Sequence, residues 1–260
     1  MHIGTEVQAP LRYEFPLTER VRLLLRLEDT AARIREQAAA ASPESHRYAL
    51  AALCELMELT TRIDLNSEIR IEADRQRTLL RNLRHLAAVD SETLDGVLSE
   101  LEAIIRTLDA YSDRAGSRCR EDGWLAMVRA RMALPGGLTR FDTPSFYCWS
   151  AIDASARRDR LLEWLSDFAC ATDSAAILLG LLRRSAETES QRAPGGQFMR
   201  TLSRQPLLVT IDTERGSMLV PEISANRSSL LVRFMHFSPT GRPRPCEDAV
   251  EFGLAVTYCG

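Results

Sequence analysis

The feature that most constrains this 260-residue chain is a change in the spacing of its apolar residues near position 186. Before that point, apolar residues recur every three or four positions, which is the spacing of amphipathic helices. After it, they alternate with polar residues, as in half-buried strands. We therefore predict an α+β fold, in which a mainly helical domain (residues 1–185) is followed by a small antiparallel β-rich domain (residues 186–260).

Several predicted helices begin or end at residues that favour helix termini. Ser42-Pro43 provides a cap and a first helical residue, and Asp90 can cap a later helix. Leu134-Pro135-Gly136-Gly137 ends a short helix, because proline cannot continue the hydrogen-bond ladder and glycine accepts positive φ. We expect helices over residues 18–37, from residue 43 past Met57, and over residues 66–86, 91–108, 121–132, 155–169 and 172–184.

Three later segments alternate between apolar and polar residues and predict strands, at residues 207–212, 230–235 and 250–258. Their connections are too short for helical crossovers, so we expect antiparallel pairing. The polar stretch 187–205 contains Pro194-Gly195-Gly196 and is typical of a loop or a hairpin. Near the N-terminus, residues 11–16 are a candidate further strand of this sheet.

The charge balance argues against bulk nucleic-acid binding, which usually requires a strong basic excess. The formal net charge is −3, and all 33 basic residues are arginine. Neither a signal peptide nor an apolar run of about 18 residues is present, so we expect a cytoplasmic protein. The six cysteines form no C-x-x-C pair, and we expect reduced, mostly buried thiols.

Known catalytic and metal-binding motifs are absent from the sequence. The four histidines are not spaced with another histidine or a cysteine as metal ligands are, and the glycine pairs lack the pattern of a phosphate loop. We therefore expect no metal, no cofactor and no enzymatic activity. An enzyme of unknown type stays an alternative, because active sites assemble in space.

Arginines collect in the middle of the chain. Residues 113–160 hold nine arginines and six acidic residues, a local positive excess on an acidic protein. Such a region suits an acidic protein partner, and the alternative is a nucleic-acid-binding module. A further arginine, Arg233, shares a strand face with Leu231 and Met235, and its head group can face a partner or form an internal ion pair.

Several motifs resemble the ZapD family along essentially the whole chain. The most specific block joins Arg120-Glu121-Asp122, Val128-Arg129-Ala130-Arg131 and Leu134-Pro135-Gly136-Gly137, and Phe141-Asp142-Thr143-Pro144 continues it. The others are Tyr13-Glu14-Phe15-Pro16-Leu17-Thr18-Glu19-Arg20, Asp74-Arg75-Gln76, Pro221-Glu222-Ile223-Ser224 and Val232-Arg233-Phe234-Met235. Gly123 and Ser229 depart from the family's basic positions, and the tail beyond Phe252 is longer than expected.

The resemblance implies a cytoplasmic homodimer, joined chiefly through its helical part, that acts at the midcell division ring. ZapD proteins bind the C-terminal tail of the tubulin-like GTPase FtsZ and bundle its filaments, which promotes Z-ring assembly. Basic residues near the domain junction are thought to receive the tail. In this chain the resemblance points to Arg62, Arg120, Arg227 and Arg233, and with less support to Arg129, Arg131 and Arg140.

Overall fold

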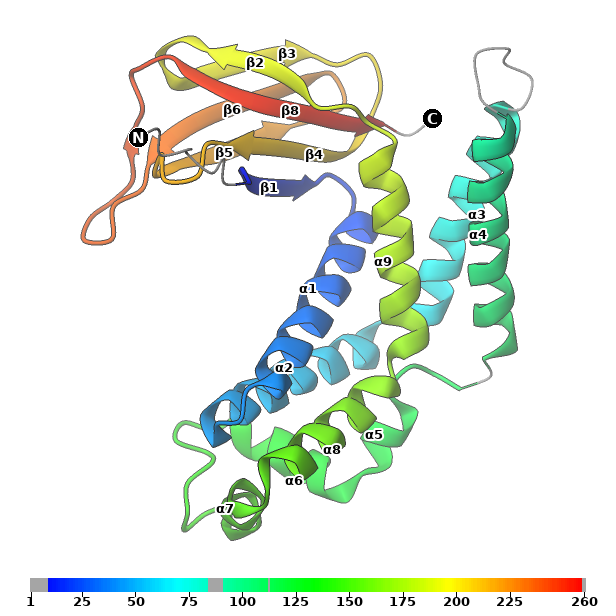
Figure 1. Ribbon diagram of the computed structural model, residues 1–260, viewed down its shortest axis with the longest axis vertical. Helices are drawn as coiled ribbons and strands as arrows, with labels where there is room; N and C mark the ends of the chain where they lie inside the picture. The colour runs from blue at the N-terminus through cyan, green and yellow to red at the C-terminus, as the bar shows by residue number, and fades with distance from the viewer. Residues whose placement is uncertain (1–8, 84–90, 112, 259–260) are drawn as a thin grey trace, which may run out of the picture. The chain divides into compact units, whose positions relative to one another are not determined.

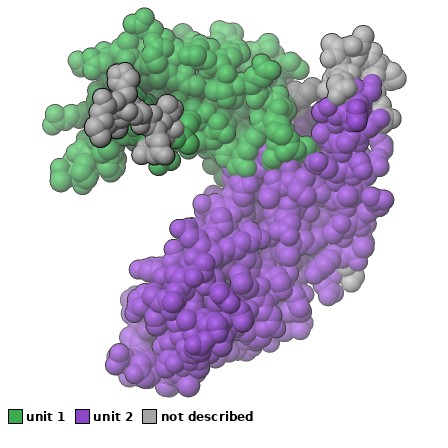
Figure 2. Space-filling model, in the orientation of Figure 1, with its two compact units in different colours: residues 1–22, 180–260 green, residues 23–179 purple. Residues whose placement is uncertain are grey.

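The structure is a computed structural model that describes residues 9–83, 91–111 and 113–258. The chain divides into two compact units (Figure 2). The helical unit comprises residues 23–179, and the β unit comprises residues 1–22 together with residues 180–260. The β unit is therefore built from both ends of the sequence, and the chain passes between units within α1 (Glu19–Ala39) and α9 (Ala169–Arg184).

The predicted apolar stripes correspond to helices, and the α+β class with helices first is confirmed. The stripe of α2 (Pro43–Arg62) illustrates the reason: Leu50, Leu53 and Met57 recur at helical spacing and are all buried. The remaining helices are α3 (Leu65–Leu83), α4 (Ser91–Ala110), α5 (Ser117–Glu121), α6 (Gly123–Met132), α7 (Pro144–Ala151) and α8 (Ala154–Ser166).

The start of α2 is capped as the sequence predicts. The Ser42 hydroxyl oxygen accepts a hydrogen bond from the Ser45 backbone N–H at 3.0 Å, and Pro43 occupies the first turn. Helix α2 packs one face into the core of the helical unit, where it contacts α6 and α8. The cap of α4 predicted at Asp90 lies outside the described residues.

Ion pairs join α3 and α4, which lie side by side within the helical unit (Figure 1). Arg70 contacts Asp109 at 2.6 Å, and Arg81 contacts Glu102 at 2.7 Å. The charged face of α3 is thus partly a helix–helix contact. The predicted extension of this helix to Leu86, with Arg84, lies outside the described residues.

Two helical predictions need correction. The helix expected over 121–132 is α6, which begins two residues later because the Asp122 carboxylate caps it, and the short helix α5 before it was not predicted. Helix α7 was not predicted, since eight residues are too few to repeat an apolar stripe. It begins at Pro144 and buries Phe146.

The β unit contains two antiparallel sheets, as the short connections predict. The first sheet has the strand order β1-β4-β8-β2, and the second has the order β3-β6-β5, with β7 also paired to β6. The strands are β1 (Leu11–Pro16), β2 (Glu189–Ala193), β3 (Gln197–Thr201), β4 (Pro206–Thr213), β5 (Leu219–Ala225), β6 (Ser229–His236), β7 (Arg244–Pro245) and β8 (Val250–Tyr258).

Apolar side chains from both sheets meet in one core. Phe252 of β8 lies at its centre, with ring centroids 5.0 Å from Phe234 and 5.3 Å from Phe198. Strand β1 pairs with β4, placing Tyr13 opposite Ile211. An N-terminal segment is therefore part of the first sheet.

The segment 187–205 is neither a loop nor a hairpin. It forms β2 and β3, which pair with β8 and β6, so the chain crosses from one sheet to the other. The crossing occurs at Gly195 and Gly196, whose φ angles are +59° and +67°. Because these strands lie at sheet edges and expose much of their length, their sequence resembles that of a loop. Strand β5 was also not predicted.

Within the described part of the chain, no single helix is both long and apolar enough to cross a membrane. Helices α8 and α9 pass the same test of length and composition only as a pair, across a 73° bend.

Candidate partner-binding site

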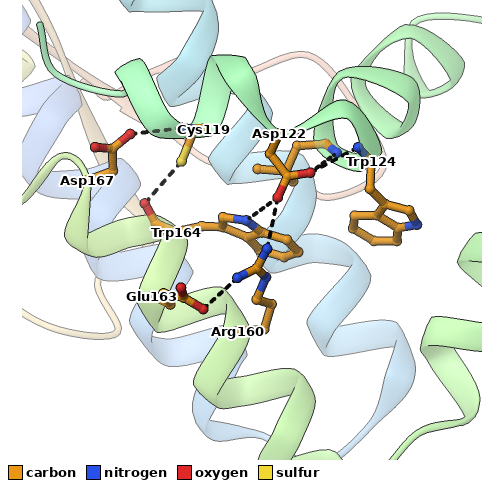
Figure 3. A network of polar contacts seen from close by, with 8 residues as sticks. Cys119, Asp122, Trp124, Arg160, Glu163, Trp164 and Asp167 are labelled. Carbon is orange, nitrogen blue, oxygen red and sulfur yellow. Dashed lines mark hydrogen bonds and ion pairs between the residues drawn. The ribbon is translucent and has the colours of Figure 1, made fainter.

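Asp122 organises the start of α6 through four donors (Figure 3). Its Oδ1 accepts hydrogen bonds from the backbone N–H groups of Trp124 at 2.9 Å and Leu125 at 3.0 Å. Its Oδ2 accepts from the Trp164 indole and from Arg160, both at 3.0 Å. Burial opposes ionisation of this carboxyl, but the four donors outweigh it and lower the pKa of Asp122.

A second carboxylate, that of Asp167, anchors α5. Its Oδ2 accepts from the Cys119 backbone N–H at 3.0 Å, and its Oδ1 accepts from Arg118 at 3.1 Å. The Cys119 thiol donates to the Trp164 carbonyl at 3.3 Å (Figure 3). Burial and the nearby Asp167 carboxylate raise the pKa of Cys119 to about 12, so this thiol stays protonated and unreactive at neutral pH.

The other cysteine thiols of the described residues are also unpaired, in agreement with reduced cysteines. Burial raises the pKa of Cys54 to about 11, and Cys246 is buried as well. Cys170 is partly buried and Cys148 is exposed, while Cys259 lies outside the described residues.

The central arginine cluster is largely neutralised by the protein itself. Arg114, Arg118, Arg158 and Arg160 form ion pairs, and Arg157 is buried. Like Arg157, the other four arginines of the cluster form no ion pair with any described residue; they are Arg120, Arg129, Arg131 and Arg140. These are the members of the cluster that the family resemblance selects. The internal pairing also reduces the positive charge that the cluster can offer to a phosphate backbone.

Arg120 is fixed in place rather than free to move. Its Nη1 donates to the Thr60 hydroxyl and to the Ala115 carbonyl, both at 2.9 Å. The guanidinium is therefore tied to the last turn of α2, which ends at Arg62. The Arg62 side chain is 79% exposed, and a 3.5 Å contact with Glu58 is too solvated to hold it firmly.

Arg129 and Arg131 lie in the last turn of α6. Arg129 is half-buried, and its Nη1 is a buried atom without a hydrogen-bond partner among the described residues. Arg131 is exposed. Its carbonyl accepts from the Leu134 N–H at 3.0 Å, which begins the turn that ends this helix.

The turn after α6 requires glycine at position 137. A Cβ added there would lie 1.6 Å from the Arg131 carbonyl oxygen, whereas one added at Gly136 meets nothing within 4 Å. We expect Gly137→Ala to lower the free energy of unfolding by about 1–3 kcal/mol, because the backbone must move. Gly136→Ala, which only strains a φ of +72°, should lower it by about 1 kcal/mol. Urea unfolding compares the two variants, and equal losses would contradict the steric argument.

Arg140 borders a hollow of about 330 Å³ in the helical unit. Its guanidinium lies 4.7 Å from the centre of the Tyr147 ring, which orients the charge over an aromatic face. A second arginine that the sequence analysis missed, Arg47, lines the same hollow with a single acidic residue, Glu44. The remaining lining residues are Pro43, Leu138, Thr139, Phe146 and Ser150.

The last two predicted arginines belong to the β5–β6 hairpin of the β unit. Arg227 is exposed in the turn, where the Asn226 side-chain oxygen accepts from the Ser228 and Ser229 N–H groups at 2.8 and 2.9 Å. Arg233 is exposed on β6 and forms no ion pair with any described residue. The alternative, an ion pair between Arg233 and a carboxylate of the helical domain, stays a prediction.

The surroundings of Arg233 combine apolar and polar side chains. On β6 it lies between Leu231 and Met235, both half-buried. The strand pairing places Met199 opposite Leu231 and Val220 opposite Met235, so these side chains share its sheet face. Met199 is 77% exposed. The face opposite the core of the second sheet thus carries Arg233 between the polar Glu222 and Gln197, with apolar side chains on either side along the strands.

The seven predicted arginines thus divide between the units, with Arg227 and Arg233 in the β unit and the other five in the helical unit. Within the helical unit they lie at the end of α2, on α5 and α6, and beside the hollow. Sequence reasoning missed Arg47, Tyr147 and Met199. The short sequence of β3, QFMRT, has no apolar–polar alternation that could have identified Met199.

Comparison with known proteins gives a consistent result. A family model described as ZapD, cell division protein, matches residues 25–233. A cell division protein ZapD of Azoarcus sp. strain BH72 is 36% identical over 250 residues, which cover 96% of this chain and 99% of the relative. Those of Aromatoleum aromaticum and Chromobacterium violaceum are 36% and 38% identical, covering 97% and 94% of this chain and 98% of each relative.

Proposed function

The chain belongs to the ZapD family of cell division proteins, and from this premise we propose that it binds the C-terminal tail of FtsZ and cross-links FtsZ filaments. The proposed role is to promote Z-ring assembly at midcell, in the cytoplasm and without enzymatic activity.

The observation that carries this proposal is the setting of Arg233. A short disordered peptide becomes ordered on binding, so its partner has to supply several contacts at once. An unpaired arginine can grip a carboxylate through two parallel hydrogen bonds. The neighbouring Met199, Leu231 and Met235 offer apolar area for the peptide's nonpolar side chains. This combination suits a peptide that is both acidic and apolar.

The other predicted arginines would extend the recognition of acidic groups. Arg62, Arg120 and Arg227 are the first of these, and Arg120 is already held in place by two hydrogen bonds. A side chain that is already held in place loses less conformational entropy on binding, so the cost of binding is lower. Arg129, Arg131 and Arg140 are further candidates.

Bundling follows from symmetry and avidity. We propose a homodimer, joined chiefly through the helical part, which would present two equivalent tail sites related by a twofold axis. A filament displays many tails, so weak single contacts become strong when several bind together. One dimer can thereby join two filaments.

The test is co-sedimentation of this protein with GTP-assembled FtsZ from the same organism. Full-length FtsZ is compared with FtsZ that lacks its C-terminal tail. We expect pelleting and bundling with the first and neither with the second. No pelleting with either form would contradict the proposal, and steeply salt-dependent binding to DNA or RNA would then favour the nucleic-acid alternative.

Arg233→Glu should weaken tail binding by more than about tenfold, because a repelling carboxylate replaces the proposed anchor. The protein should stay folded, since this side chain is exposed. Arg242→Glu is the matched control, because it makes the same charge change at another exposed site of the β unit. If both variants pelleted with FtsZ as the unmodified protein does, Arg233 would lie outside the site.

A further inference from the structure

Three metal-binding side chains meet in the β unit. They are His236 at the end of β6, and Cys246 and Asp248 in the connection between β7 and β8. The imidazole nitrogen, the thiol sulfur and the carboxylate oxygen all lie within 4.8 Å of one another. We propose that these three residues form a binding site for a zinc-class divalent cation.

The position of the thiol is fixed by the fold. The Cys246 N–H donates to the Phe234 carbonyl at 2.9 Å, which places this residue against β6. On the other side, the backbone passes so closely at Gly196 that an added Cβ would lie 2.1 Å from the Cys246 carbonyl oxygen. Cys246 is therefore held between β6 and the turn that precedes β3, while His236 and Asp248 are exposed and can rotate.

The donor set indicates which class of cation would bind. Thiolate and imidazole ligands favour zinc and related transition metals, whereas magnesium and calcium prefer oxygen ligands. In a tetrahedral zinc site the donor atoms lie about 3.3–3.7 Å apart. The present distances, at most 4.8 Å, therefore need to shorten by no more than about 1.5 Å, which rotation of the two exposed side chains can supply.

The charge of these three side chains and the number of ligands they supply also suit a zinc-class cation. Binding would displace the thiol proton to solvent, leaving one thiolate and one carboxylate to neutralise a divalent ion beside a neutral imidazole. Three protein ligands leave a fourth position for water, as in open zinc sites. The bound ion would tie the end of β6 to the β7–β8 connection. Cobalt provides a spectroscopic probe, because a thiolate ligand gives a charge-transfer band and tetrahedral coordination gives intense d–d bands.

The experiment uses the full chain without an affinity tag, freed of metal by a chelator. Zinc is titrated in competition with a chromophoric chelator, and cobalt is added to parallel samples. We expect one zinc per chain, a thiolate-to-cobalt charge-transfer band, and a melting temperature that zinc raises and chelator lowers again. Cys246→Ser should abolish the charge-transfer band.

His236→Gln and Asp248→Asn keep the thiol and change only exposed side chains, so the fold should persist. Each should weaken zinc binding by more than about tenfold. Cys148→Ser, at an exposed cysteine of the helical unit, is the matched control and should leave binding unchanged. Undiminished zinc affinity in both the His236 and Asp248 variants would overturn the proposal, as would loss of the cobalt band in the Cys148 variant alone.

Discussion

Replacing Arg157 with methionine is expected to lower the free energy of unfolding of the helical unit by about 3–5 kcal/mol. Arg157 is only 4% exposed and forms no ion pair with any described residue. Its guanidinium instead donates to four acceptors from separate parts of the unit. Methionine fills similar space but donates nothing, so the buried His46 nitrogen would be left unsatisfied and three part-buried carbonyls would lose a charged donor.

The geometry around Arg157 explains the size of this effect. Its Nε donates to His46 Nδ1 at 2.8 Å, and its Nη2 donates to the Ala41 carbonyl at 3.0 Å. Its Nη1 donates to the carbonyls of Ser150, at 3.0 Å, and Ile152. Because His46 Nδ1 accepts, its Nε2 carries the proton and donates to the Ala38 carbonyl at 3.2 Å. Arg157 of α8 thus links the α1–α2 connection and the start of α2 to the end of α7 and the residue that follows it.

Tryptophan fluorescence during urea unfolding measures the change, since all three tryptophans lie in the helical unit. The matched control is Arg158→Met at the neighbouring exposed residue, whose contact with Asp159 is solvated. We expect the control to change stability by no more than about 1 kcal/mol. Similar losses in the two variants would show that the buried hydrogen bonds of Arg157 contribute little.

Asp122→Ala should lower the free energy of unfolding by about 2–4 kcal/mol. Loss of the cap on α6 accounts for about 1 kcal/mol, and the buried Trp164 indole N–H left without an acceptor accounts for a further 1–3 kcal/mol. Arg160 keeps its contact with Glu163 at 2.7 Å, so the loss of its bond to Asp122 costs less stability. The same fluorescence-detected unfolding experiment measures the effect, and Asp159→Ala is an exposed control.

The lowered pKa of Asp122 adds a pH dependence. A carboxyl whose pKa is depressed by folding stabilises the native state above its unfolded pKa of about 3.9, and this contribution disappears as the pH falls through the folded pKa. Asp122→Asn can still cap α6 but cannot ionise. The variant should therefore lose less stability than the unmodified protein when the pH falls below about 4. Parallel pH profiles would contradict the proposed ionisation.

Part of the candidate site was predictable from local sequence. Arg233 lies on a strand whose alternation identifies its face, and the structure places it among the expected Leu231 and Met235. Met199 was missed because it belongs to β3, a strand whose polar sequence is typical of a loop. The cation site was missed for a related reason: His236 and Cys246 are too far apart in sequence for a motif, and only the pairing of β6 with β7 brings them together.

The spacing of apolar residues in the sequence predicts the helices and strands that are long and amphipathic. Helices such as α2 and α4, and strands such as β6 and β8, bury residues at a regular period, and that period is visible in the sequence. The sequence by itself therefore determined the α+β class, the order of its parts and, through its motifs, the ZapD family. The cap at Ser42 was equally visible, because its hydrogen bond is local.

Tertiary structure alone decided the features that depend on distant residues. It split the arginine cluster into paired and unpaired members, since an ion pair such as Arg118–Asp167 joins residues far apart in sequence. Only in the folded chain is Arg157 buried beside backbone carbonyl groups. Likewise, only tertiary pairing places β2 and β3 in different sheets. Burial and long-range pairing arise only when separate segments pack together, whereas helical and strand periods arise within a single segment.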